Sequence, residues 1–239
     1  GLNFRDVLNV LGEYPGDPGP PGLDCSGAIS EVGSSASIHL GWIVGGAAFG
    51  FAFGSLASQA HTDGRLLAAR PCALSAAQAT SLPITWSTTH VALGNAQLRA
   101  RQAPLVHTTA GGVGLVALEY VSLLGASSDA VGTAGGASKH RLLREIGCAR
   151  LHSSRSGGAF AVGCAHTLGS HRLHAVLNSL SGDLTACSFA LLGLASSFME
   201  IGKRGVWSSP RVLASRYAQV DLSVLAIDDD LTNGPSWMR

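Results

Sequence analysis

The strongest constraint on the fold is a glycine-rich turn between an apolar segment and a helix-like segment. Thr109–Gly114 matches G-x-G-x-x-G at its second and third glycines, Gly111 and Gly114. Pro104–Val106 reads as a short buried strand, and apolar residues recur at helical spacing from Val113 to Leu124. A strand, a glycine turn and a helix in this order are typical of a phosphate-binding turn, because the first helix amides can face an anion. A glycine turn without a ligand is the alternative.

The residues after the next predicted strand indicate which dinucleotide would bind. No acidic residue follows the strand Ala130–Ala134 at the place where one would accept hydrogen bonds from an adenosine ribose. The chain instead continues with the small, polar and cationic segment Gly135–Arg141. Such residues suit a 2′-phosphate, so the sequence predicts NADPH rather than NADH. Ordinary surface cations at a helix start are the alternative interpretation.

The pattern of elements predicts two domains. The chain before about Pro71 is glycine-rich with short strand-like pieces, whereas strands and helices alternate after Ser75. We therefore expect a small first domain over residues 1–75 and an α/β domain with a doubly wound parallel sheet over residues 76–239. The predicted helices are 76–79, 113–124 and 138–146, and the predicted strands are 104–106, 130–134, a short strand before 153, 173–178 and 197–201. Ligands bind at the carboxyl ends of such strands.

Composition and charge exclude several classes of function. The 239 residues are 46% hydrophobic and 13% charged, with a formal net charge of +1 and no basic stripe, so we expect no nucleic-acid partner. The uncharged segment Gly41–Ala57 is shorter than the ~20 residues of a membrane span, and buried strands linked by glycine turns explain it better. The five cysteines form no C-x-x-C pair, which indicates reduced thiols and a cytoplasmic location.

Six segments carry a resemblance to a known family, in the family's order. They are Leu2–Val7, Gly22–Gly27, His107–Gly114, Ser153–Arg155, Val176–Leu180 and Met199–Lys203. Together they resemble an enoyl reductase domain of a polyketide synthase or animal-type fatty acid synthase, in the zinc-free medium-chain dehydrogenase/reductase superfamily. The resemblance implies a Rossmann domain with a smaller, incomplete β-barrel-like (GroES-like) substrate domain. It also implies that the chain is an excerpt of a larger synthase.

The resemblance implies an activity and partners. The reaction would be NADPH-dependent reduction of a trans-α,β-unsaturated acyl thioester on an acyl carrier protein, with hydride to the β-carbon and a proton to the α-carbon. Neighbouring synthase domains would be further partners, and a homodimer is left open. Zinc-dependent members of the superfamily place a histidine and a glutamate where this chain has Leu23 and Asp24. Since leucine cannot bind zinc, we expect no metal.

The resemblance and the pattern together nominate binding residues. The expected cofactor-binding residues are Gly111, Gly112, Val113, Gly114, Thr133, Ser138, Lys139, Arg141, Arg155 and Asn178. Among the cations, Lys139 stands at the family's lysine position, whereas Arg141 stands one place later than the family's arginine. Asn3 and Phe4 are expected in the substrate pocket.

Three residues are candidates for the catalytic proton. The family implies Lys203 at the end of the E-x-G-K segment and Asp228, with Asp221 as a second alignment for the aspartate. His90 and Val91 stand where the family often has a tyrosine pair, and we hypothesise that His90 takes the place of one of these tyrosines as a donor. The alternatives are a solvated lysine at a strand end, an aspartate in an acidic run, and a histidine that only packs in the pocket wall.

Two functions from other classes remain open. A stand-alone NADPH quinone oxidoreductase of the same superfamily would share the nucleotide site without a carrier protein. A catalytically degenerate domain would bind NADPH and only scaffold its synthase, and the missing tyrosine pair keeps that interpretation in view.

Overall fold

The computed structural model describes residues 1–126, 129–202, 213, 216 and 219–233. The chain divides into two compact units, one formed by Gly1–Ser87 with the segment that begins at Ala226, and one formed by Thr88–Leu225. This division differs from the predicted domains 1–75 and 76–239. The helix α3 (Ala76–Ala79) and the start of α4 (Pro83–Asn95) belong to the first unit, and the chain returns to that unit after Leu225.

The first unit is built on an antiparallel sheet in the order β1-β2-β3, with β1 at Asp24–Ala28, β2 at Ala47–Phe51 and β3 at Leu67–Ala69. It also contains α1 (Phe4–Val10), α2 (Ser34–Leu40) and the short 3-10 helix η1 (Gly64–Leu66). The uncharged segment Gly41–Ala57 thus contributes the strand β2 and turns rather than several linked strands. In the described ranges, no helix is long and apolar enough to cross a membrane.

Buried aspartates explain why distant segments join the first unit. Asp24 of β1 is buried, and its Oδ1 accepts a hydrogen bond from the Ile84 amide at the start of α4 at 2.9 Å. Near the other end of the chain, α10 (Ile227–Asn233) carries Asp228. The Asp228 carboxylate accepts a hydrogen bond from the Tyr14 hydroxyl and lies 3.6 Å from Arg5 Nε. These contacts bind the start of α4 and α10 to the N-terminal segment.

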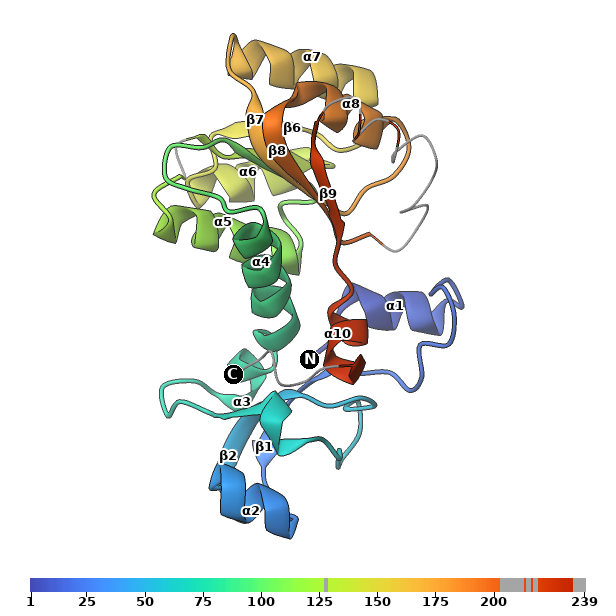
Figure 1. Ribbon diagram of the computed structural model, residues 1–239, viewed down its shortest axis with the longest axis vertical. Coiled ribbons are helices and arrows are strands. Elements are labelled where there is room, and N and C mark those ends of the chain that lie inside the picture. Colours follow the sequence, from blue (N-terminus) through green and yellow to red (C-terminus); the bar gives the residue numbers. More distant parts are fainter. Residues whose placement is uncertain (127–128, 203–212, 214–215, 217–218, 234–239) are drawn as a thin grey trace. The chain divides into compact units, whose positions relative to one another are not determined.

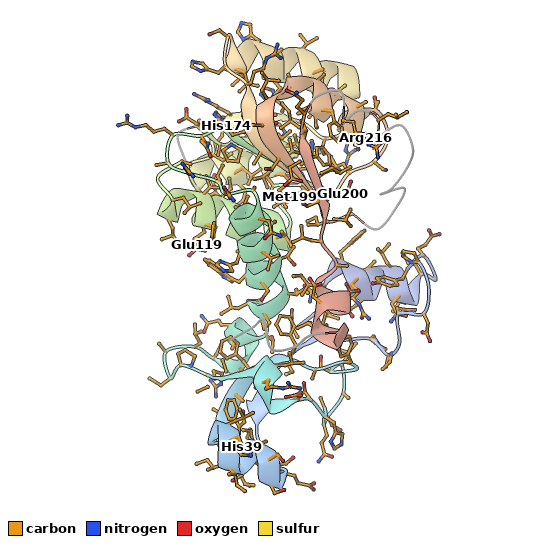
Figure 2. All side chains as sticks on the ribbon, in the orientation of Figure 1. His39, Glu119, His174, Met199, Glu200 and Arg216 are labelled. Carbon is orange, nitrogen blue, oxygen red and sulfur yellow. The ribbon has the colours of Figure 1, made fainter. Side chains whose placement is uncertain are left out.

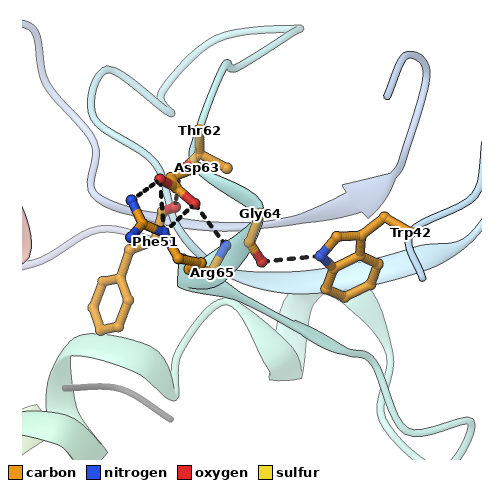
Figure 3. A network of polar contacts seen from close by, with 6 residues as sticks. All are labelled: Trp42, Phe51, Thr62, Asp63, Gly64 and Arg65. Carbon is orange, nitrogen blue, oxygen red and sulfur yellow. Dashed lines mark hydrogen bonds and ion pairs between the residues drawn. The ribbon is translucent and has the colours of Figure 1, made fainter. Parts of the chain in front are cut away.

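The turn that leads into β3 is fixed by polar contacts with its neighbours (Figure 3). Thr62 Oγ1 donates to the Phe51 carbonyl at 2.6 Å, and Trp42 Nε1 donates to the Gly64 carbonyl at 2.9 Å. Asp63 accepts from the backbone and the guanidinium of Arg65. Because the Asp63–Arg65 pair is solvent-exposed, the two contacts to backbone carbonyls hold the turn more firmly than the ion pair does.

The second unit is a parallel sheet in the order β6-β5-β4-β7-β8-β9. Its strands are β4 (Pro104–Val106), β5 (Val131–Ala134), β6 (Arg150–Ser153), β7 (Leu173–Asn178), β8 (Leu192–Glu200) and β9 (Asp221–Val224). The helices are α5 (Gly112–Leu123), α6 (Ala137–Glu145), α7 (Gly157–Leu168) and α8 (Asp183–Leu191). Figure 1 shows α5 and α6 on one face of this sheet and α7 and α8 on the other. This arrangement confirms the predicted doubly wound fold.

The two faces of the sheet have separate cores because side chains alternate along each strand. Leu105 of β4 packs with Phe160 of α7 and Phe198 of β8. The next residue, Val106, faces the other side of the sheet, where it packs with Ala117 of α5 and Met199 of β8. Because helices cover both faces of the sheet, the central strands are apolar throughout. Short runs of apolar residues therefore indicate these strands in the sequence.

One ionisable side chain lies inside the second unit at the end of β4. His107 is buried, its ring centroid is 5.5 Å from that of Phe160, and its ring nitrogens contact the hydroxyls of Ser188 and Thr133. Burial lowers the pKa of the His107 imidazole from 6.5 to about 3, because the charged form would lose its hydration. The folded protein therefore holds this histidine neutral.

We expect His107 to make the stability of the chain fall in mild acid. Since its folded pKa of about 3 lies below the ordinary 6.5, the unfolded chain binds the proton more tightly. Above pH 6.5 the imidazole is neutral in both states and does not reduce the free energy of unfolding. Below pH 6.5 the free energy of unfolding decreases by up to about 1.4 kcal/mol per pH unit. Chemical denaturation of the wild type and His107→Asn between pH 7 and 4.5 measures this, and the wild type should show the steeper loss. Equal slopes for the two proteins would contradict the assignment.

Candidate functional site

The glycine turn leads directly into α5 and presents the start of that helix. Gly111 is the N-cap in an extended conformation, and its amide donates to the Thr108 carbonyl at 2.8 Å. The amides of the first helical turn have no carbonyl partner within the helix, so they are available to an anion. A Cβ at Gly114 would lie 2.5 Å from the Thr109 carbonyl oxygen and 2.7 Å from that of Thr108. Only glycine permits this close approach, which keeps the turn against the helix.

Thr109 holds the turn against β5. Its amide donates to the Thr133 carbonyl at 2.9 Å, while the Thr133 amide donates to Thr109 Oγ1 at 2.8 Å. The same Thr109 hydroxyl donates to the Val106 carbonyl at 2.7 Å. A Cβ at Gly132 would meet Thr109 Oγ1 at 2.7 Å, so the glycine leaves room for the hydroxyl. Thr109 occupies the place of the motif's first glycine and fixes the turn through its side chain.

Thr133 and Asn178, two of the residues expected to bind the cofactor, are fully buried. The Thr133 hydroxyl accepts from the Thr108 amide at 3.2 Å and lies 3.1 Å from His107 Nδ1. Asn178, at the end of β7, donates from Nδ2 to Glu200 Oε2 and to the Leu180 carbonyl, each at 2.8 Å. Both side chains form hydrogen bonds within the protein at the ends of their strands.

Glu200 is a site residue that sequence reasoning missed. It ends β8 beside Met199 (Figure 2), and its side chain is buried. Its Oε2 accepts from Asn178, and its Oε1 accepts from the Gly202 amide at 2.8 Å. The carboxylate therefore fixes the backbone immediately before Lys203, which itself lies outside the described residues. The signal in the sequence was the glutamate of the E-x-G-K segment at the end of an apolar strand.

The strand order reverses between β4 and β7, and the turns after these strands meet there. In the sheet, β5 and β6 follow β4 on one side of this point, and β8 and β9 follow β7 on the other side. The hydroxyls of Thr108 and Ser179 contact each other across this point. Thr108 has a φ of +48°, which is uncommon for a residue with a side chain and is concentrated at functional turns. Ligands of doubly wound sheets bind at such a reversal point.

The cationic residues lie at the neighbouring strand ends, and they differ in their contacts. Arg155 follows β6, and a Cβ at Gly135 would lie 2.9 Å from Arg155 Nε, so the guanidinium group lies against Gly135. Ser138 and Lys139 are exposed in the first turn of α6. Arg141 instead forms an exposed ion pair with Glu145, one turn along the same helix, at 3.9 Å. The structure thus gathers Arg155 and the start of α6 at the end of β5.

The described candidate proton donors belong to different units: His90 and Asp221 to the second, and Asp228 to the first. His90 is exposed on α4, and its Nδ1 lies 3.1 Å from the Tyr120 hydroxyl on α5. Tyr120 is about 12 Å along the helix axis from Gly112, at 1.5 Å per residue. Asp228 lies in α10 of the first unit, where its carboxylate contacts the Tyr14 hydroxyl. Asp221 is the exposed first residue of β9.

The two residues expected in the substrate pocket have different environments. Asn3 precedes α1 and donates from Nδ2 to Asp24 Oδ2 at 2.7 Å. Phe4 begins α1 and is 73% exposed. At the positions compared with zinc ligands, Leu23 belongs to the apolar core. The Asp24 carboxylate accepts hydrogen bonds from Asn3 Nδ2 and from the amide at the start of α4. Within the described ranges, no group of three or more His, Cys, Asp or Glu residues could hold a metal ion.

Comparison with known proteins relates this chain to polyketide synthases. No family model matches it. It is 39% identical over 225 residues to the erythronolide synthase EryA2 of Saccharopolyspora erythraea, covering 93% of this chain and 6% of that protein. It is 37% identical over 209 residues to a highly reducing polyketide synthase of Aspergillus terreus, covering 85% of this chain and 8% of that protein. The chain therefore spans less than a tenth of the length of either relative.

Solved structures give the same relationship at the level of the fold. The CurK enoyl reductase matches all of this chain and 73% of its own, with a TM-score of 0.88 and 29% identity. The quinone oxidoreductase of Escherichia coli, solved with NADPH, matches 97% of this chain and 72% of its own, with a TM-score of 0.82 and 22% identity. The chain is thus a homologue of a segment of polyketide synthases, with the fold of the enoyl reductases in the medium-chain dehydrogenase/reductase superfamily.

Proposed function

We propose that this chain is an NADPH-dependent enoyl reductase that reduces a trans-α,β-unsaturated acyl thioester on an acyl carrier protein within a synthase. The observation that carries the proposal is the arrangement at the adjacent ends of β4 and β5. There the start of α5 offers unpaired amides, and Arg155 and Lys139 lie at the end of the next strand. The similarity to polyketide synthases and to the CurK enoyl reductase supports the same reaction class.

The residues at these strand ends fit the phosphate groups of NADPH. The amides of Gly112, Val113 and Gly114 would bind the pyrophosphate, as helix N-termini do for other anions. Arg155 and Lys139 would bind the 2′-phosphate by charge-assisted hydrogen bonds, with Ser138 as a neutral donor. Gly135 contributes by leaving the space that the Arg155 guanidinium fills. When bound, NADPH would supply the hydride for the β-carbon of the substrate.

We expect Lys139 and Arg155 to set the preference for NADPH over NADH. Replacing either with alanine removes a hydrogen bond to a phosphate, so the ratio of NADPH to NADH affinity should fall about tenfold or more. Arg141→Ala is the matched control, because Arg141 is paired with Glu145 along α6. Fluorescence titration with both nucleotides measures the ratio. A loss of preference in Arg141→Ala that equals the loss in the other two variants would refute this assignment.

The proton for the α-carbon is assigned to Lys203. An ammonium group beside the forming enolate would stabilise its negative charge and could donate a proton. Glu200 and Asn178 support this assignment, because they fix the chain through Gly202, the residue before Lys203. His90 is not assigned this role, since its Nδ1 lies 3.1 Å from the Tyr120 hydroxyl.

A pair of variants distinguishes these two donors. Lys203→Met should lower kcat about 100-fold with little change in NADPH affinity, because general acid catalysis contributes 10²–10⁴-fold. His90→Phe keeps an aromatic ring beside Tyr120 and should keep kcat within about threefold, because it removes no proton donor from the reaction. Steady-state kinetics with an enoyl thioester measures both. A large loss in His90→Phe with normal turnover of Lys203→Met would reverse the assignment.

The reaction class is tested by the substrate that drives NADPH oxidation. We expect the chain to oxidise NADPH with a crotonyl thioester and to form the butyryl thioester, because the activated double bond is the hydride acceptor in the proposed reaction. A small quinone is the comparison substrate. Faster turnover of the quinone would indicate a quinone oxidoreductase. Binding of NADPH without turnover of either substrate would indicate a scaffold domain.

A further inference from the structure

A directional chain of hydrogen bonds runs from the exposed turn into the interior of the second unit. Ser188 Oγ donates to the Leu184 carbonyl at 2.8 Å within α8, so its single proton is used there. Ser188 must therefore accept from His107 Nε2, which lies 2.8 Å away. The imidazole is held neutral by burial, so Nε2 carries its only ring proton and Nδ1 is an acceptor.

The other side of the ring continues the chain toward the turn. His107 Nδ1 accepts from the Thr133 hydroxyl at 3.1 Å, which leaves the oxygen of that hydroxyl to accept from the Thr108 amide at 3.2 Å. Each donor in this series is used once: the Thr108 amide, the Thr133 hydroxyl, the imidazole Nε2–H and the Ser188 hydroxyl. The series fixes one tautomer of His107 and one rotamer of Thr133.

The residue at the exposed end of the series is the strained one. Thr108 has a φ of +48°, and its carbonyl accepts the Gly111 amide that closes the turn before α5. Its carbonyl also lies close to the position that a Cβ at Gly114 would occupy. A shift in Thr108 would therefore move the N-terminus of α5, where the proposed phosphate contacts lie. The constraint on Thr108 from the β5 side is the bond to the Thr133 hydroxyl.

We propose that His107 is a positioning residue for nucleotide binding, acting through Thr133 on Thr108. The Nδ1 atom of His107 orients the Thr133 hydroxyl, and that hydroxyl holds the Thr108 amide so that the turn and the start of α5 keep the geometry for a dinucleotide phosphate. The inference rests on the proposed function for the identity of the ligand. His107 itself is buried and does not touch the nucleotide.

Two substitutions at His107 separate the two sides of the ring. Asparagine places a carbonyl oxygen near the Nδ1 position and keeps the acceptor for Thr133, whereas glutamine places an amide N–H near the Nε2 position and keeps the donor for Ser188. We expect NADPH affinity to stay within about threefold in His107→Asn and to fall about tenfold or more in His107→Gln. A role in stability alone would lower affinity in step with the melting temperature in both variants.

Substitutions at Thr133 give an independent check with little change in volume. Thr133→Ser keeps the hydroxyl and should keep NADPH affinity, whereas Thr133→Val removes it and should weaken binding as His107→Gln does. Hydrogen exchange of the Thr108 amide should be faster in Thr133→Val and His107→Gln than in the wild type, His107→Asn and Thr133→Ser. This readout needs no bound nucleotide.

The outcomes separate this inference from the proposed function. Equal loss of affinity in His107→Asn and His107→Gln, or unchanged Thr108 exchange in Thr133→Val, would overturn the positioning role. Failure of the wild type to bind NADPH would contradict the proposed function. Thr108 exchange would then decide the positioning role by itself, with faster exchange in Thr133→Val supporting it and unchanged exchange overturning it.

Discussion

The second unit depends on the reciprocal bonds between Thr109 and Thr133. They join the glycine turn to β5, while Gly114 lets α5 begin almost in contact with the turn. Because these contacts involve backbone atoms and buried hydroxyls, they fix the turn without using the amides at the helix start. Those amides have no carbonyl partner within the helix and so remain available to an anion. The proposed nucleotide site is therefore a consequence of how β4, β5 and α5 are connected.

The supports of the site are polar side chains buried beneath the strand ends. His107 and Thr133 lie under the turn after β4, and Asn178 and Glu200 lie under the turns after β7 and β8. Each is satisfied by a neighbour in the protein, which avoids the large cost of a buried polar group without a partner. Arg155, with Gly135 beneath it, is the exposed counterpart at the end of β6. The proposed binding groups are thus exposed backbone and cations, and the side chains that contact the turns from below are buried.

The sequence predicted the central elements well because they carry strong local signals. Apolar runs beside glycines gave β4, β5, β7 and α5 within one or two residues. Helices α7 and α8 were not predicted, since α7 is rich in glycine and alanine and both are defined by packing on the sheet rather than by a polar face. β8 begins at Leu192, five residues before its predicted start at Ser197, because its first residues are not continuously apolar. Local patterns cannot reveal the return of Asp228 to the first unit, which depends on contacts with Tyr14 and Arg5.

The site residues show the same limit in chemical terms. The sequence nominated Lys139 and Arg155 because cations at strand ends are informative. A threonine at a strand end gives no comparable signal, because the sequence does not show whether its hydroxyl would contact a ligand or a buried histidine. The measurement that tests the account most directly is calorimetric titration of the chain with adenosine 2′,5′-bisphosphate and with 5′-AMP. The account predicts that the bisphosphate binds about tenfold more tightly or better, because only it reaches Lys139 and Arg155. Equal affinity for the two nucleotides, or binding of neither, would contradict it.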